Sequence, residues 1–237
     1  MASAGWVIFS GDREDRSMSL WQKLLGRLFP EKEELEEAPD ERETTPEPEE
    51  PRVFVISDTH FNHKNVIRFT KRPYRTVWGM NRSIIHKWND TVRLQDQIFF
   101  LGDFAWSNIG YFITRLNGRK TFITGNHDRR LHHTQDSAVI EYRGFRFLLI
   151  HNPAHRPPEW DGWTIHGHVH NVSWDRHPYI DRVTRRVNVS VEMIGFRPVS
   201  LHRIVETIHF MEEYGHEVMP TRKHAAWLKK KATQNYT

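Results

Sequence analysis

The chain has 237 residues, of which 38% are hydrophobic, and this is enough for one well-packed domain with an appendage. It contains no cysteine, so disulfides and thiolate zinc sites are excluded and any metal must be held by nitrogen and oxygen atoms. The formal net charge is +4, and because no apolar run is long enough for a transmembrane segment or a secretory signal, we expect a cytoplasmic protein.

The first predicted element is a short amphipathic helix within an N-terminal extension that comprises residues 1–30. Four leucines share one face of the segment 19–29, namely Leu20, Leu24, Leu25 and Leu28. Such a helix could dock onto a partner or lie on a membrane surface. It could equally pack on its own domain or form only in part, because a helix this short is marginal alone.

Residues 31–51 contain eleven acidic residues, two basic residues and four prolines. This stretch lacks the apolar surface that would offset the entropy lost on ordering, so we predict a disordered acidic linker. Its net charge is −9 and that of residues 1–30 is +1, which leaves +12 for residues 52–237. A basic body suits an anionic substrate such as a phosphoester, and the linker could fold back onto it as a polyanion mimic. A generic solvated basic surface is the alternative.

From residue 52 onward, predicted strands and helices alternate. Buried strands are predicted at 52–57, 97–101, 121–123, 145–150 and 163–165, and a strand of alternating polarity at 186–191. Apolar residues at helical spacing predict helices around 77–88 and 109–116, and a third that begins at Leu201 with Ser200 as its N-cap. This order predicts a layered α/β domain over residues 52–220, followed by a basic C-terminal tail at 221–237.

Polar clusters follow five of these strands directly. Their members are Asp58 and His60, Asp103, Asn126 and His127, His151, and His168 and His170. Open α/β sheets place their ligands at the carboxyl ends of strands, so these side chains are expected to share one edge. Mixed His, Asp and Asn ligands suit Mn²⁺, Fe²⁺ or Zn²⁺ better than Ca²⁺ or Mg²⁺, and manganese is the ion we would test first. The alternative is that these polar side chains merely cap the sheet, which would require metal-compatible residues to follow five strands by chance.

These motifs resemble the signature of the calcineurin-like metallophosphoesterases, which runs Asp-x-His, Gly-Asp, Gly-Asn-His-Asp, His, Gly-His-x-His. The resemblance covers roughly residues 52–200 and is nearest to the small bacterial and phage branch, through segments 57–65, 101–104 and 188–192. It implies an α/β fold, a four-layer αββα sandwich of two mixed β-sheets with flanking helices and a dinuclear metal site at the strand carboxyl-terminal edge.

The resemblance further implies two sets of three ligands for two divalent metal ions, joined by one bridging carboxylate. The sets are Asp58, His60 and His170, and Asn126, His151 and His168, with Asp103 as the bridge. A metal-bridging hydroxide would attack phosphorus, and His127 would act as the general acid that protonates the leaving oxygen. Asp128 could orient the His127 imidazole and raise its pKa, or it could be a loop-capping carboxylate.

Weaker candidates for the substrate pocket lie near these motifs. His63 and Asn62 follow the first ligands, and Arg129 follows the proposed acid. Phosphate binding is less expected than solvation for Arg68, Arg72, Arg82 and Arg130. Core or rim packing is more expected than base stacking for Trp106, Trp160, Trp163 and Trp174. Three further histidines are interpreted as structural, namely His155, His166 and His177.

The favoured function is hydrolysis of a phosphodiester or nucleotide-type substrate, because the body is basic, and nucleic acid is a candidate partner. A phosphomonoesterase or protein phosphatase is the alternative enzyme. A third interpretation is a non-catalytic binding scaffold on the same fold, as in the retromer's phosphoesterase-like subunit. That interpretation predicts eroded ligands, and in this sequence every expected ligand is present.

Overall fold

The computed structural model describes residues 50–172 and 176–219, and all structural statements refer to these residues. The helix predicted at 19–29, the acidic linker except for its last two residues, and the basic tail lie outside them. Among the described helices, none is both long and apolar enough to cross a lipid bilayer.

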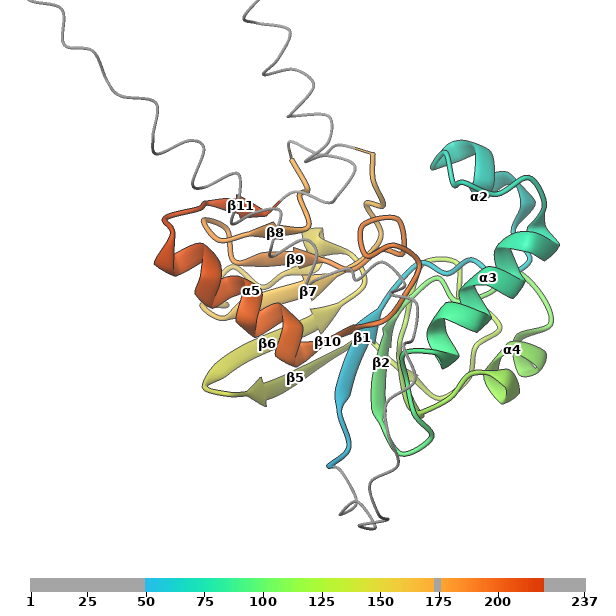
Figure 1. The fold of residues 1–237 in the computed structure, drawn as a ribbon, viewed down its shortest axis with the longest axis horizontal. Helices are drawn as coiled ribbons and strands as arrows, with labels where there is room; N and C mark the ends of the chain where they lie inside the picture. Colours follow the sequence, from blue (N-terminus) through green and yellow to red (C-terminus); the bar gives the residue numbers. More distant parts are fainter. Residues whose placement is uncertain (1–49, 173–175, 220–237) are drawn as a thin grey trace, which may run out of the picture. The chain divides into compact units, whose positions relative to one another are not determined.

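Two β-sheets form the body of the described domain (Figure 1). The first has the order β10-β1-β2-β3-β4, in which β1 to β4 pair in parallel and β10 pairs antiparallel with β1. Its strands are β1 (Val53–Ile56), β2 (Gln97–Leu101), β3 (Arg119–Ile123), β4 (Thr134–Gln135) and β10 (Val199–Ser200).

The second sheet has six strands in the order β11-β8-β9-β7-β6-β5. The neighbours β6, β7 and β9 run parallel, whereas the outer pairs are antiparallel. Its strands are β5 (Ser137–Tyr142), β6 (Phe145–Ile150), β7 (Trp163–His166), β8 (Ile180–Asp181), β9 (Arg186–Asn188) and β11 (Val218–Met219). Both sheets are mixed, as predicted.

Within residues 50–172 and 176–219, four α-helices and a short 3₁₀-helix connect the strands and cover the sheets. They are α2 (Lys64–Phe69), α3 (Val77–Asn89), α4 (Ile109–Arg115), η1 (Pro153–His155) and α5 (Leu201–Glu213). On α3, Trp88 is fully buried with its ring 6.3 Å from that of Phe100 in β2. On α5, His209 packs its ring 5.3 Å from that of Phe145 in β6. Helices therefore flank both sheets, which confirms the predicted α/β architecture.

Local sequence explains where the helices begin. The hydroxyl of Ser200 accepts a hydrogen bond from the Arg203 amide at 3.2 Å, which confirms it as the N-cap of α5. Thr76 caps α3 in the same way by accepting from the Gly79 amide at 3.1 Å. The predicted strand at 186–191 ends earlier, at Asn188, because the Asn188 side chain accepts from the Ser190 amide and turns the chain.

The two sheets meet at the edge where the polar clusters lie. In-register pairing aligns the ends of the central strands, because Ile56 pairs with Phe100 and Leu101 pairs with Ile123. Just beyond β1, Ser57 forms a parallel bridge with Ser190, the segment that follows β9 in the other sheet. The carboxyl ends of strands from both sheets are thereby held together by backbone hydrogen bonds.

Candidate metal centre

The predicted ligands leave their strands in an unusual backbone conformation. Five of the seven have positive φ angles, namely Asp58 (60°), His60 (47°), Asp103 (60°), His168 (69°) and His170 (47°). This left-handed region costs an L-residue about 1–2 kcal/mol. Backbone hydrogen bonds compensate, since the Asp58 amide donates to Gly102 O and the His60 amide to Asp103 O, both at 3.0 Å. Such strain, concentrated at one edge, is typical of a functional site.

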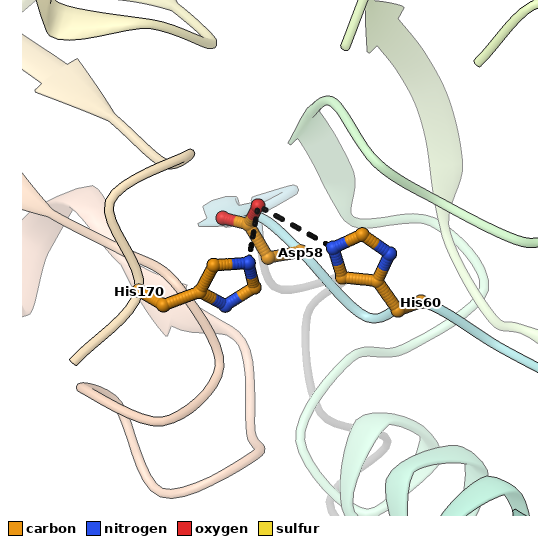
Figure 2. A group of neighbouring side chains, drawn as sticks. All are labelled: Asp58, His60 and His170. Carbon is orange, nitrogen blue, oxygen red and sulfur yellow. Dashed lines mark ion pairs between the residues drawn. The ribbon is translucent and has the colours of Figure 1, made fainter. Parts of the chain in front are cut away.

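Asp58, His60 and His170 form the first group of side chains that could hold a metal ion (Figure 2). The Oδ1 atom of Asp58 lies 4.0 Å from His60 Nε2 and 3.7 Å from His170 Nε2. This oxygen is buried and has no hydrogen-bond partner, whereas Oδ2 accepts from the His168 amide at 3.0 Å. An unsatisfied buried carboxylate oxygen is costly. A cation between the three side chains would satisfy it, so the group fits a metal ion.

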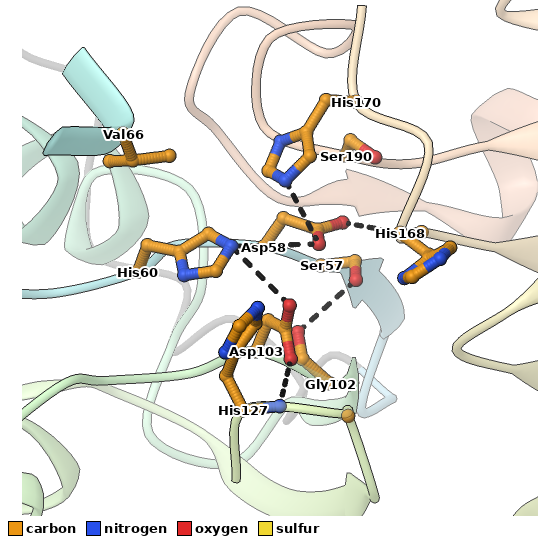
Figure 3. Close-up of polar contacts among 12 residues, drawn as sticks. Ser57, Asp58, His60, Val66, Gly102, Asp103, His127, His168, His170 and Ser190 are labelled. Carbon is orange, nitrogen blue, oxygen red and sulfur yellow. Dashed lines mark hydrogen bonds and ion pairs between the residues drawn. The ribbon is translucent and has the colours of Figure 1, made fainter. Parts of the chain in front are cut away.

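Figure 3 shows the carboxylate of Asp103 paired with His60 of the first set and with the backbone amide of His127. Its Oδ2 atom is 3.4 Å from His60 Nε2 and 3.6 Å from His151 Nε2, one histidine of each set. Its Oδ1 atom accepts from the His127 amide at 2.9 Å. Burial and the neighbouring Asp58 carboxylate raise the pKa of Asp103 to about 6. Positive charge nearby would relieve both effects.

The second set brings acceptor atoms together. His151 Nδ1 lies 2.8 Å from Leu101 O, and because a carbonyl only accepts, this nitrogen carries the proton. The lone pair of His151 Nε2 then faces Asn126 Oδ1 at 2.9 Å. His168 Nδ1 approaches the same two atoms, at 2.9 Å from Asn126 Oδ1 and 3.2 Å from His151 Nε2. Burial and His151 lower the pKa of His168, which favours the neutral form that binds metals. In the His168 tautomer that leaves Nδ1 unprotonated, three acceptors converge here, and this arrangement fits a cation.

A buried ion pair supports the first set, and no local sequence pattern predicts this pair. Glu192 lies with both carboxylate oxygens 3.1 Å from His170 Nδ1. Arg72 donates to Glu192 from Nε at 2.8 Å, and its Nη2 lies 2.7 Å from the same carboxylate. Burial raises the pKa of Glu192, but Arg72 and His170 outweigh it and bring the value to about 2. Carboxylates in this position orient metal-binding histidines.

The same arginine also fixes the backbone of the first ligands. Its Nη2 donates to Asp58 O at 2.7 Å and its Nη1 to Thr59 O at 2.8 Å. Arg72 is therefore buried and fully engaged, which corrects the expectation of a solvated or phosphate-binding side chain. The partners Arg72 and Glu192 lie 120 positions apart, so no sequence pattern links them.

His127 and Asp128 have different surroundings although they are adjacent. His127 is exposed at the rim of the site, with its ring 5.7 Å from that of His60. Asp128 is buried, and its carboxylate accepts from the amides of Asp103 (2.6 Å), Phe104 (2.8 Å) and Gly125 (2.9 Å). These hydrogen bonds are those of a loop-capping carboxylate, the second of the two interpretations left open by the sequence. Asp128 thus holds the loops of Asp103 and His127 together.

The weaker candidates have diverse surroundings. Asn62 donates from Nδ2 to Ser107 O and Oγ, both at 3.3 Å, and accepts from Asn81 Nδ2 at 2.7 Å, so its amide joins the loop of Ser107 to helix α3. The ring of His63 lies 5.3 Å from that of His60, beside the site. Arg129 and Arg130 are exposed.

The remaining arginines, Arg68 and Arg82, are exposed, whereas the tryptophans and histidines range from buried to exposed. Arg68 and Arg82 lie over the rings of Phe69 (5.9 Å) and Trp78 (5.3 Å). Trp163 is buried and accepts at its carbonyl from Trp160 Nε1 at 3.0 Å, whereas Trp174 lies outside the described residues. His166 is buried, His177 is half-buried and His155 is exposed.

Comparisons with known proteins give a consistent result. Residues 52–190 match the model of the calcineurin-like phosphoesterase superfamily domain. The chain is 43% identical over 163 residues to the uncharacterized protein MJ1445 of Methanocaldococcus jannaschii, and the match covers 66% of this chain and 91% of that protein. The solved structure of the protein of unknown function AQ665 from Aquifex aeolicus matches with a TM-score of 0.51 and 25% identity, over 67% of this chain and all (100%) of that one.

Proposed function

The chain belongs to the calcineurin-like phosphoesterase superfamily, and from this premise we propose that it is a metal-dependent hydrolase of phosphoesters. A phosphodiester or nucleotide-type substrate is favoured, in keeping with the basic body. One observation carries the proposal. Ligating atoms from both sheets converge at one edge, where the buried Asp58 Oδ1 lacks a partner that a cation would provide. The cytoplasmic location stays a prediction from the sequence.

Two divalent ions, Mn²⁺, Fe²⁺ or Zn²⁺, would be held by seven side chains. Asp58, His60 and His170 would hold one, and Asn126, His151 and His168 the other, with Asp103 shared. When bound, the ions would neutralise the phosphoryl oxygens and lower the pKa of a water molecule toward neutrality. The position of Asp103 Oδ2, within 3.6 Å of a histidine from each set, supports the shared role.

His127 would protonate the leaving oxygen. Its backbone amide is anchored to Asp103 Oδ1 at 2.9 Å, so the imidazole is held at the rim of the site but remains accessible to substrate. Asp128 keeps this loop in place through its three amide hydrogen bonds. A general acid that is positioned by the backbone in this way contributes about 10²- to 10⁴-fold to a rate.

The test uses purified protein with Mn²⁺ and a panel of bis-p-nitrophenyl phosphate, p-nitrophenyl phosphate, cyclic nucleotides and single-stranded nucleic acid. His127→Ala should lower kcat by about 10²- to 10⁴-fold and leave metal content intact. Asp103→Ala should reduce metal content. The matched control is His132→Ala, an exposed histidine in the same loop, which should retain wild-type activity.

The outcomes separate the alternatives. Faster turnover of p-nitrophenyl phosphate than of the diester would favour the phosphomonoesterase or protein phosphatase. Protein that binds metal yet hydrolyses nothing in the panel would contradict the proposal and favour the binding scaffold.

A further inference from the structure

Trp106 presents a large aromatic ring to solvent beside the candidate metal centre. The residue lies in the segment after β2, and its side chain is 54% exposed. Its backbone is nevertheless fixed, because the Trp106 amide donates to Phe61 O at 2.8 Å and Ala105 forms a β-bridge with Phe61. The hydrogen bonds from Asn62 to Ser107 hold the next residue. The exposed ring is therefore anchored on rigid backbone.

One face of this ring is already stacked. The imidazole of His63 lies parallel to the indole of Trp106, with ring centroids 4.5 Å apart and an interplanar angle of 12°. His63 in turn lies 5.3 Å from the ring of His60. The Trp106 ring is also 6.0 Å from that of His127. The pair thus forms an aromatic ledge, defined as Trp106 backed by His63, on the His127 side of the site.

We propose that this aromatic ledge stacks on the base of a nucleotide-type leaving group, so that Trp106 is a specificity-determining residue. The inference rests on the proposed function, in which His127 protonates the leaving oxygen. The leaving group must then extend from phosphorus toward His127, the side on which Trp106 lies. A nucleobase offers the flat π-face that an exposed tryptophan can stack on, whatever the base. Rigid placement reduces the entropy lost when the base is bound.

The chain offers a matched control for surface aromaticity. Trp78 in α3 is 68% exposed, similar to Trp106, but its ring is covered by the Arg82 guanidinium at 5.3 Å. The described contacts of Trp106, in contrast, are to the histidines of the site. Trp78→Ala therefore removes an exposed indole without altering the ledge.

The test compares two phosphate esters that differ only in the base. Binding of adenosine 5′-monophosphate and of ribose 5-phosphate to the full-length protein loaded with Mn²⁺ is measured by isothermal titration calorimetry. Stacking of one base should make the wild type prefer the nucleotide by about 5- to 100-fold. Trp106→Ala should bring this ratio to about 1 without weakening ribose 5-phosphate binding, and Trp106→Phe should keep part of it. Trp78→Ala should keep the wild-type ratio.

A wild-type ratio near 1, a Trp106→Ala ratio equal to that of wild type, or no binding of the nucleotide would each overturn the inference. The failure of the proposed function looks different. A protein that prefers the nucleotide but hydrolyses no phosphoester would support base stacking on the ledge and contradict the proposed function. A protein that hydrolyses bis-p-nitrophenyl phosphate but shows no preference for the nucleotide would support the proposed function and contradict base stacking on the ledge.

Discussion

Glu192→Ala should damage both the stability of the domain and its affinity for metal. The Glu192 carboxylate neutralises the buried guanidinium of Arg72 and accepts a hydrogen bond from His170. Its removal leaves the Arg72 charge uncompensated and the His170 Nδ1 proton without this acceptor. Arg72 would retain its hydrogen bonds to the carbonyls of Asp58 and Thr59, but no described carboxylate would remain in contact with it.

The magnitude follows from burial. Both partners are nearly inaccessible, with side chains 0% and 3% exposed, so solvent screens the uncompensated charge very little. Breaking a buried pair by removal of one partner costs about 3–5 kcal/mol. For a chain of this size the melting temperature should fall by about 6–20 °C. Loss of the carboxylate that orients His170 should weaken metal binding by about 10- to 100-fold.

Urea denaturation of the metal-free protein measures the first effect, and calorimetric titration with Mn²⁺ measures the second. The control is Glu206→Ala on α5, where the carboxylate is 55% exposed and paired with His202 at 3.2 Å. That change should alter the free energy of unfolding by less than about 0.5 kcal/mol. The paired change of Arg72→Met with Glu192→Leu should cost less than the sum of the single changes. A Glu192→Ala protein as stable as the control, with wild-type metal affinity, would refute the reasoning.

The remaining predictions concern a glycine, a carboxylate and the bound metal. Gly125→Ala should lower the free energy of unfolding by about 1–3 kcal/mol in urea and impair Mn²⁺ binding, because the new Cβ would clash with the Asp103 amide nitrogen. Gly110→Ala, which has open space in α4, should not be destabilising. Burial raises the pKa of Asp96, but hydrogen bonds from Arg52 and Arg93 outweigh it and lower the value. The stabilising contribution of Asp96 is therefore present at neutral pH and lost as the pH falls below about 4. In urea denaturation, Asp96→Asn should lower the free energy of unfolding at pH 7, and its difference from wild type should shrink at pH 3. A difference that is the same at both pH values would contradict this. Mn²⁺ at about 100 times its Kd should stabilise the protein by about 2.7 kcal/mol per site, an increase that a chelator should reverse in a thermal melt.

Local pattern predicted that the side chains of the candidate metal centre gather at one sheet edge, because each of them stands next to the feature that positions it, and their role as metal ligands stays a prediction. Asp103 follows a buried strand and the glycine Gly102, whose φ of 88° and close approach to His151 Nδ1 exclude a side chain. The strand, the turn and the polar residue are all within a few positions, so the sequence contains the whole signal. The fold class followed from the order of strands and helices for the same reason.

Contacts between distant segments were not predictable in this way. The pairing of Arg72 with Glu192 joins the segment after α2 to the turn after β9, and neither residue type distinguishes a buried pair from two solvated charges. Strand β5 was missed because it lies at the edge of its sheet and its residues alternate between exposed and half-buried, so its short apolar run at 138–140 does not mark a buried strand. The role of Asp128 required the positions of three amides from two loops.

The central claim is that seven side chains at one sheet edge hold two metal ions. Anomalous diffraction from a crystal of the Mn²⁺-loaded protein tests it most directly. We predict two peaks, one among Asp58, His60 and His170 and one among Asn126, His151 and His168, with Asp103 in contact with both. No peak at this edge, or a single ion that leaves either set of ligands unused, would contradict the account.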